Sequence, residues 1–422
     1  MKKLLLHRLF MLAIALPSVF ATATELDMPD LPPASMVESA LNNHLVVLNA
    51  TSNLTLEQAN QRRWNSGNYE FNLRAGSAQR NVTSNGQKFK EWDIALERPL
   101  RLFNKATIDQ EIGAASVARA NFALGDARHE AGRTLLHLWF AWQREQAQVT
   151  LWQKQMDILQ LQASMVEKRV KAGDAAKLEL NQAQMMTAQA SVSLQQAQLR
   201  AQLSNNVLRR EFPTTQWLEE TLSPATPQPI EHDYAYWKTR ILEDNHELGM
   251  AQEHSRVQQL LAQRSRADRI PDPTIGARYS SEVGGTEKIS GIYVSIPLST
   301  TQRSATADMA AQQAAIAADQ FAFVQRRLES DVYNAYNQAV NSYASWQKAH
   351  EVAISVNHNA MLVSKAYSLG EGSLTDSLTA RRNALDASLA DTLAQLDANE
   401  SRYRLLLDAH RLWSFDDHDD KP

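Results

Sequence analysis

The sequence predicts a mainly α-helical protein with a membrane β-barrel, built from two structural repeats of helix, β-hairpin and long helical hairpin. Three observations support this prediction. The order of features repeats at an offset near 200 residues, four short segments alternate apolar and polar residues, and the runs 100–212 and 298–421 contain no proline. A repeat of this kind indicates the architecture of the whole chain, so it is considered first.

The two halves share the order of their features rather than their residues. The segment RVKAGDAAKLELNQAQ (169–184) aligns with AYSLGEGSLTDSLTAR (366–381), which places Gly173 over Gly370. Further corresponding positions are Pro99 with Pro297, Phe122 with Phe321 after a one-residue slip, and Asn43-His44 with Asn245-His246.

The first 23 residues have the form of a secretory signal peptide. Lys2 and Lys3 precede an apolar stretch from Leu9 to Phe20, and residues 21–23 offer a small-residue cleavage site. A buried N-terminal helix is the alternative. Cleavage would leave 40 basic and 47 acidic residues, a net charge of −7, without the basic patches of a nucleic-acid-binding protein. The sequence has no cysteine, so we expect no lipid anchor and no thiolate metal site.

Each half is expected to begin with one helix of about 30 residues and to continue with two strands. The segment EWDIALE places Trp92, Ile94 and Leu96 on one side and acidic residues on the other. Such period-two alternation is typical of strands with one apolar and one polar face. The helices are expected at 34–65 and 233–267, and the strands at about 68–80, 88–98, 272–282 and 287–297.

Four amphipathic strands need a partner for their apolar face. Segments near 9 to 11 residues long, together with a signal peptide, favour membrane strands over a soluble sheet packed on itself. Known membrane barrels begin at eight strands, so two or three copies of this chain would have to pool theirs. Trp92, Tyr279 and Tyr293 are candidates for an aromatic girdle at the bilayer interface, with ordinary packing as the alternative.

The absence of proline predicts a very long helix after each strand pair, at 104–171 and 302–368. At 1.5 Å per residue each helix would be roughly 100 Å long. Each is expected to turn at a glycine and return, so that the helical hairpins span about 104–210 and 302–412. Helices of this length indicate a coiled coil or a helical tube.

Motifs of enzymes are missing from the sequence, including the P-loop, G-x-S-x-G and H-E-x-x-H. The histidines are scattered along the chain. We therefore expect no enzymatic activity, no catalytic residue, no cofactor and no metal site, and place the function in permeation and docking. The segment DDHDDKP (416–422) is interpreted as a disordered acidic tail, with chelation of a divalent metal as the alternative.

Two half-repeats of helix, β-hairpin, long helix, glycine turn and return helix resemble the TolC-like outer-membrane factor family of Gram-negative bacteria. The resemblance covers nearly all of the chain after residue 23. It implies a homotrimer with a 12-stranded barrel in outer-membrane lipid and an α-helical tunnel that extends into the periplasm. It also implies the exit duct of a tripartite pump, with a periplasmic adaptor (membrane fusion protein) and an inner-membrane RND or other pump as partners.

The segment GIYVSIPL and the short hairpin loops resemble the heavy-metal branch of that family. This favours metal ions or other small toxic compounds as the exported substrates. The exit channel of a type I secretion system is an alternative within the same fold. A soluble periplasmic coiled-coil adaptor or scaffold is the alternative from another class, although adaptors normally carry β-rich domains around one helical hairpin.

The turn segments KAGDAAKLELNQAQ and YSLGEGSLTDSLTARR resemble the paired tip motif of the family. Position by position, Glu179, Tyr367 and Asp376 correspond to the periplasmic gate, with Tyr367 as a hydrogen-bond donor and the acids facing the pore. The alternative for both acids is ordinary helix N-terminal residues favoured by the macrodipole. The resemblance assigns contacts with the adaptor to the hairpin tips, at Gly173, Asp174, Gly370, Gly372 and Ser373.

This chain departs from the family pattern at two positions of the tip. Gly372 stands where a basic residue is expected, and Thr379 where a second acid is expected, with Lys177 as a candidate basic partner.

The expected organisation is a signal peptide (1–23), a first repeat (24–212), a linker or equatorial segment (213–232), a second repeat (233–412) and an acidic tail (413–422).

Overall fold

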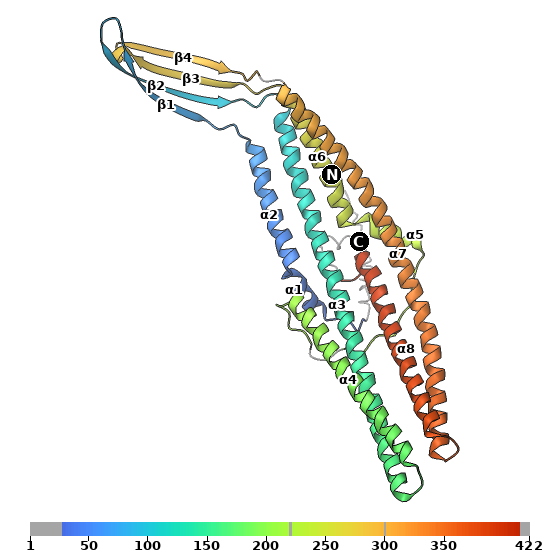
Figure 1. Ribbon diagram of the computed structural model, residues 1–422. Helices are drawn as coiled ribbons and strands as arrows, with labels where there is room; N and C mark the ends of the chain where they lie inside the picture. The colour runs from blue at the N-terminus through green and yellow to red at the C-terminus, as the bar shows by residue number, and fades with distance from the viewer. Residues whose placement is uncertain (1–27, 219–221, 299–300, 414–422) are drawn as a thin grey trace, which may run out of the picture.

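A computed structural model describes residues 28–218, 222–298 and 301–413 of the chain (Figure 1). The molecule is elongated, with a β-sheet at one end and the tips of two long helical hairpins at the other (Figure 1). The expected signal peptide and residues 414–422 of the expected tail lie outside these ranges. No helix in the described part of the chain combines the length and the apolar character that a membrane crossing requires.

The four strands form one antiparallel sheet in the order β1-β2-β3-β4, as expected from the alternating segments. The first strand begins later than predicted, because Tyr69 is held by side chains instead of the strand ladder. Its carbonyl oxygen accepts from Arg98 Nε at 2.8 Å, and its hydroxyl donates to Asp272 at 2.8 Å. The bounds are β1 Asn72–Asn81, β2 Lys88–Pro99, β3 Thr274–Glu282 and β4 Glu287–Ser295.

The expected long helices are present as α3 and α7, each of 68 residues. The helix α3 ends at Gly173, whose φ of 84° lies in the left-handed region that glycine adopts without strain. Gly370 has the same role after α7, with φ 82°. The long helices and their return helices are α3 Lys105–Ala172, α4 Lys177–Glu211, α7 Thr301–Ser368 and α8 Leu374–Asp408.

The return helix α8 ends four residues before the predicted residue 412. His410 has a left-handed φ of 56°, and the Arg411 N–H donates back to the Leu406 carbonyl oxygen at 2.8 Å. These contacts close the helix end in the manner of a C-terminal cap.

The prediction of one 30-residue helix at the start of each half is wrong, because each half has two helices there. The side chain of Asn245 accepts a hydrogen bond from Leu248 N at 2.8 Å and so begins a new helix. In the first half, the residue before α2 is His44, whose extended backbone likewise ends one helix before the next begins. The helices are α1 Ala34–Asn42, α2 Leu45–Ser66, α5 Tyr234–Glu243 and α6 His246–Ala267.

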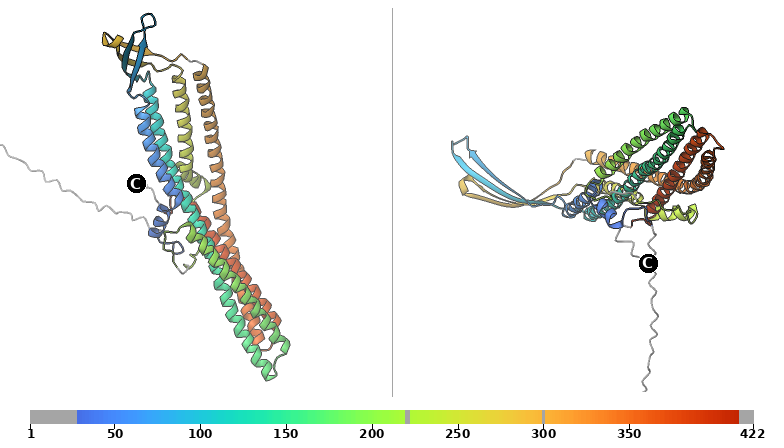
Figure 2. Two further views of the ribbon diagram at one scale, coloured as in Figure 1. Left: turned by 60° about the vertical axis from the view of Figure 1, so that its left-hand side comes forward. Right: turned by 90° about the horizontal axis from the view of Figure 1, so that it is seen from below.

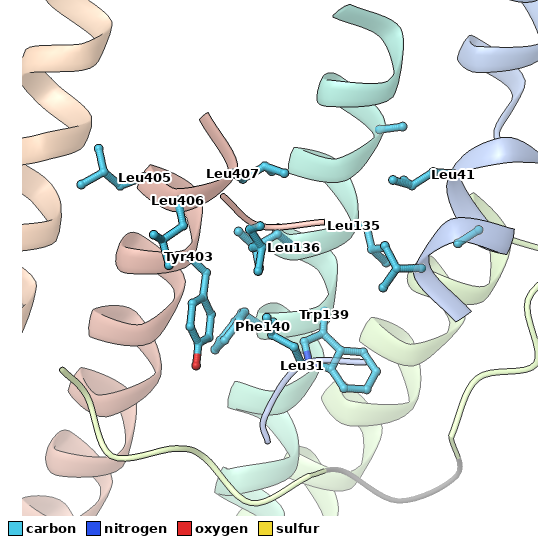
Figure 3. Packing of buried hydrophobic residues seen from close by; sticks show 14 of the residues in the cluster. Leu31, Leu41, Leu135, Leu136, Trp139, Phe140, Tyr403, Leu405, Leu406 and Leu407 are labelled. Carbon is cyan, nitrogen blue, oxygen red and sulfur yellow. The ribbon is translucent and has the colours of Figure 1, made fainter. Parts of the chain in front are cut away.

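The main hydrophobic core lies halfway along the molecule, where α8 packs against α3 (Figure 3). Phe140 of α3 packs against Tyr403 of α8, with ring centroids 5.9 Å apart, and Trp139, Phe140 and Tyr403 are all almost fully buried. We call this region the waist core. Figure 2 shows the two hairpins continuing from the waist side by side towards the tips.

One buried carboxylate joins several segments at the waist core. The Asp30 carboxylate accepts hydrogen bonds from Tyr403 Oη at 2.6 Å, Asn399 Nδ2 at 2.8 Å and Ala225 N at 3.2 Å. The Asp30 carbonyl oxygen accepts from the Trp139 indole at 2.8 Å. The N-terminal segment, α3, α8 and the segment after α4 therefore meet at a single residue.

Candidate functional site

The sheet has one continuous apolar face that the described chain leaves open to solvent. The strand register places Leu73 opposite Leu96, Leu96 opposite Ala277 and Ala277 opposite Ile292. The residues Leu73, Leu96 and Ile292 are 66, 47 and 90% exposed. Burying a side chain of this size yields about 1.5–3 kcal/mol. An exposed row of this kind therefore indicates contact with an apolar partner.

The opposite face of the sheet is polar. Arg80 forms ion pairs with Glu91 and Glu282, each at 2.6 Å. Tyr293 also lies on this face, where its hydroxyl donates to Glu97 at 2.5 Å. Because it points away from the apolar face, the assignment of Tyr293 to an aromatic girdle is wrong.

Two aromatic rings do share the apolar face. The rings of Trp92 and Tyr279 lie 5.6 Å apart between their centroids. Both side chains are exposed, at 49 and 37%. Aromatic side chains at the rim of an apolar band are typical of a membrane interface.

The two edges of the sheet are β1 and β4 within the described chain. The backbone donors and acceptors on their outer sides have no neighbouring strand among the described residues. Natural proteins cover or pair such edges, because an open edge promotes uncontrolled association. The outer sides of β1 and β4 are therefore places where a further strand could pair.

The predicted gate residues Tyr367 and Glu179 meet at the other end of the molecule. Tyr367, near the end of α7, donates a hydrogen bond to the carboxylate of Glu179, in the first turn of α4, at 3.1 Å. The guanidinium of Arg169 lies over the Tyr367 ring, 5.2 Å from its centroid. Burial, and then this hydrogen bond to Glu179, raise the pKa of Tyr367 above its ordinary value. We call the Tyr367–Glu179 contact the tip contact.

Apolar packing under the tip contact holds the hairpins together. Leu374 and Leu378 of α8 lie in one buried cluster with Leu159 and Val166 of α3 and Ala183 of α4. The structure therefore brings residues of both repeats into one small core at the tips.

Asp376 is exposed and is bound within its own turn. Its backbone N–H donates to Ser373 Oγ at 3.0 Å, and the Ser373 hydroxyl donates to the Asp376 carboxylate at 2.7 Å. This is the geometry of a helix N-terminal cap. The structure thus provides a local role for Asp376 and Ser373, while a role in the pore stays a prediction.

The remaining tip residues shape the turns. Asp174 N donates to the Arg169 carbonyl oxygen at 2.8 Å, which closes the end of α3. Gly372 does not adopt a left-handed conformation, but a Cβ at this position would lie 3.3 Å from the backbone nitrogen of Tyr367. Lys177 begins α4 and is exposed, as is Thr379.

One group of residues could not be identified as a cluster from the sequence. The structure gathers His129, His246 and His410, with ligating nitrogens all within 4.8 Å of one another. More than 100 residues separate each of these histidines from the next. Sequence spacing therefore could not indicate the cluster, and the interpretation of the histidines as scattered missed it.

Comparison with known proteins detects no similarity at the level of sequence. No family model matches the chain, and no curated protein matches it.

Solved structures do match over most of the chain. The CmeC outer membrane channel of Campylobacter jejuni has 15% identity and a TM-score of 0.73, over 91% of this chain and 86% of CmeC. The Vibrio cholerae outer membrane protein VceC has 15% identity and a TM-score of 0.73, over 90% of this chain and 95% of VceC. The open state of the Neisseria gonorrhoeae MtrE outer membrane channel has 16% identity and a TM-score of 0.69, over 92% of this chain and 90% of MtrE.

The chain therefore has the fold of these outer-membrane proteins, with two repeats of strand pair and helical hairpin. More particularly, the chain has the fold of the TolC-like outer-membrane factors, which confirms at the level of fold the resemblance drawn from the two half-repeats. These likenesses do not single out the heavy-metal branch, since several outer-membrane proteins match the fold with similar TM-scores.

Proposed function

We propose that three copies of this chain form an outer-membrane channel, which serves as the passive exit duct of a tripartite efflux system. The observation that carries this proposal is the four-stranded sheet with an exposed apolar face and two open edges. Long paired hairpins extend from it and end in a cross-repeat tip contact. The likeness to outer membrane channels of known structure supports the same reading.

The two open edges of the sheet indicate how the copies would assemble. Pairing β1 of one copy with β4 of the next would continue the antiparallel order and would satisfy both open edges. Three sheets would then close into a twelve-stranded barrel, above the smallest known size of eight. The face with Leu96 and Ile292 would contact lipid, and the face with Arg80 and Glu97 would line a water-filled lumen.

The hairpins would continue the lumen as a helical tunnel into the periplasm. We propose that Tyr367, Glu179 and Asp376 form the constriction at its end. Threefold symmetry would turn each carboxylate into a ring of three, which favours cations at the narrowest point. The neighbouring turn residues Gly173, Asp174, Gly370, Gly372 and Ser373 would contact the periplasmic adaptor.

Cell fractionation with gel electrophoresis tests the location and the assembly. The unheated protein should be found in the outer-membrane fraction and should run as an oligomer that heating converts to a monomer. A protein in the soluble periplasmic fraction that runs as a monomer without heating would refute the channel and favour a soluble adaptor.

Conductance in planar lipid bilayers tests the gate. The double variant Asp376→Ala with Glu179→Ala should lower the preference for cations over anions, because two carboxylate rings are lost. Glu371→Ala, which removes an exposed acid of the α7–α8 turn outside the proposed gate, is the matched control. Equal selectivity in the double variant and the wild type would show that these acids do not line the constriction.

We propose small toxic compounds as the exported substrates, with metal ions as the first class to test. A strain that lacks the protein should become more sensitive to metal salts, and a plasmid copy should restore tolerance. Unchanged sensitivity to metals and small toxic compounds, together with loss of a secreted polypeptide, would instead assign the chain to type I secretion.

A further inference from the structure

Three histidines from separate helical elements converge beside the waist core. His129 lies within α3, His246 is the first residue of α6, and His410 follows the end of α8. All three are partly buried. The Nε2 atom of His129 lies 3.4 Å from Nδ1 of His410, and His246 packs against both rings with centroids 5.5 and 5.0 Å away.

The backbone around the cluster is adapted to these side chains. Gly125 lies one helical turn before His129, and a Cβ there would come within 2.7 Å of the His246 ring. The missing side chain of Gly125 is therefore the space that the imidazole occupies. His410 holds a left-handed φ of 56°, a conformation that costs energy for any residue except glycine. His410 adopts this conformation at the point where its imidazole contacts His129.

The distances suit a tetrahedral metal site. Two nitrogens at 2.0–2.1 Å from a tetrahedral ion lie about 3.3–3.4 Å apart. The His129 Nε2 and His410 Nδ1 atoms, which share a hydrogen bond in this structure, already have this separation, at 3.4 Å, and a bound metal ion would replace the proton between them. The third nitrogen, which lies within 4.8 Å of the others, has to approach by about 1.5 Å or less, which ring rotation can supply.

One carboxyl lies close to the cluster. Asp126, partly buried one turn from His129, interacts electrostatically with Glu130, Glu247, Arg133 and His246, and Arg133 is itself paired with Glu130 and Asp408. Carboxylates near metal-binding imidazoles commonly orient the rings and make them better ligands. Imidazole nitrogen is a preferred ligand of zinc, copper and nickel.

We propose that His129, His246 and His410 bind one divalent transition-metal ion per chain, with three imidazole ligands and a fourth position open to water. This is the group of potential ligands that the described residues bring together at metal-binding distances. The ion would connect α3 of the first repeat to α6 and to the end of α8 in the second. The proposal concerns the waist and does not depend on transport through the lumen.

Titration of the metal-stripped, full-length protein with Zn²⁺ in detergent tests this proposal. Calorimetry against a competing chelator should give one ion per chain, and Zn²⁺ should raise the melting temperature. Co²⁺ as a second probe should give the intense visible absorption of a tetrahedral complex. His129→Gln, His246→Gln and His410→Asn should each weaken binding by about 100-fold or more, since loss of an outer-sphere partner alone costs about 10- to 100-fold.

His137→Gln is the matched control, because His137 lies on the same helix with a side chain that is 72% exposed and bound to Glu400. His418→Gln in the acidic tail tests the competing location. Binding that the three cluster variants leave unchanged, or that His137→Gln or His418→Gln abolishes, would overturn the proposal. If a cluster variant fails to fold, the wild-type Co²⁺ spectrum decides: weak octahedral absorption, or none, would contradict a three-histidine site.

Discussion

Replacing Asp30 by alanine tests whether the waist core depends on one buried carboxylate. Asp30 is fully buried and accepts hydrogen bonds from Tyr403, Asn399 and Ala225. Tyr403 and Asn399 are each only 2% exposed, so water cannot easily replace the lost acceptor. The substitution therefore removes the acceptor that two residues of α8 share with the segment after α4.

The magnitude follows from these contacts. A hydrogen bond to a charged group contributes about 1.5–3 kcal/mol, so the two buried side-chain bonds together contribute about 3–6 kcal/mol. Burying the carboxylate has its own cost, which the substitution relieves, and Asn399 keeps its bond to the Ala225 carbonyl oxygen at 2.8 Å. We expect a net loss of about 2–4 kcal/mol in the free energy of unfolding. Tyr403→Phe, which removes one of the bonds, should cost about 1–2 kcal/mol.

Urea denaturation followed by tryptophan fluorescence provides the assay. With a slope of about 3 kcal/mol per M for a chain of this size, the midpoint of Asp30→Ala should fall by about 1 M. The double variant with Tyr403→Phe should lose less than the sum of the single losses, because both remove the same bond. A midpoint equal to that of the wild type, or strict additivity, would show that the Asp30 carboxylate does not stabilise the waist core through Tyr403.

Three further predictions concern the tips and the strand–helix junction. Tyr367→Phe should weaken the tip contact by about 1 kcal/mol and raise the open fraction in bilayers about fivefold. Because the pKa of wild-type Tyr367 is raised, the contribution of its hydroxyl is present below the ordinary tyrosine pKa near 10 and is lost as pH rises through the raised value. In Glu179→Gln, ultraviolet absorbance should show the Tyr367 phenol ionising at lower pH than in the wild type. Gly370→Ala should cost about 1–2 kcal/mol in thermal melts because of its left-handed φ, whereas Gly372→Ala, which lacks that φ, should cost less. Lys105→Met should cost about 3–5 kcal/mol in urea denaturation, because the fully buried Lys105 ammonium binds the Ile270 carbonyl oxygen and Asp272, each at 2.8 Å.

The sequence predicts the elements whose cause is local. Alternation at positions 92, 94 and 96 indicates a strand, and the lack of proline after Pro99 indicates a long helix. Ends set by distant partners were not predictable. The first strand begins late because Tyr69 binds Asp272, more than 200 residues away, and α8 ends early because His410 turns its backbone.

The residues of the candidate site likewise include some with a local cause, which the sequence indicates, and others brought together only by distant contacts. Comparison of the two halves indicates Gly173 and Gly370 as turns, since both positions need a left-handed φ. The contact of Tyr367 with Glu179 joins residues 188 positions apart, so only the resemblance of the paired turns could indicate it. The three histidines do not recur as a set in both halves, and they have no characteristic spacing in the sequence. The cluster depends entirely on how α3, α6 and the end of α8 pack.

Disulfide crosslinking between β1 of one copy and β4 of another is the most direct test of whether the sheets of different copies join. The natural sequence has no cysteine, so one cysteine at Ser77 of β1 and a second placed in turn along β4, at Gly291, Ile292 or Tyr293, would report on this contact alone. Cysteines at the paired positions Leu96 and Ala277 of β2 and β3 are the control and should link only within one chain. We expect at least one β1–β4 pair to yield covalent dimers and trimers on a denaturing gel after oxidation in the membrane. Monomers alone from every β1–β4 pair, with the β2–β3 control fully linked, would contradict it.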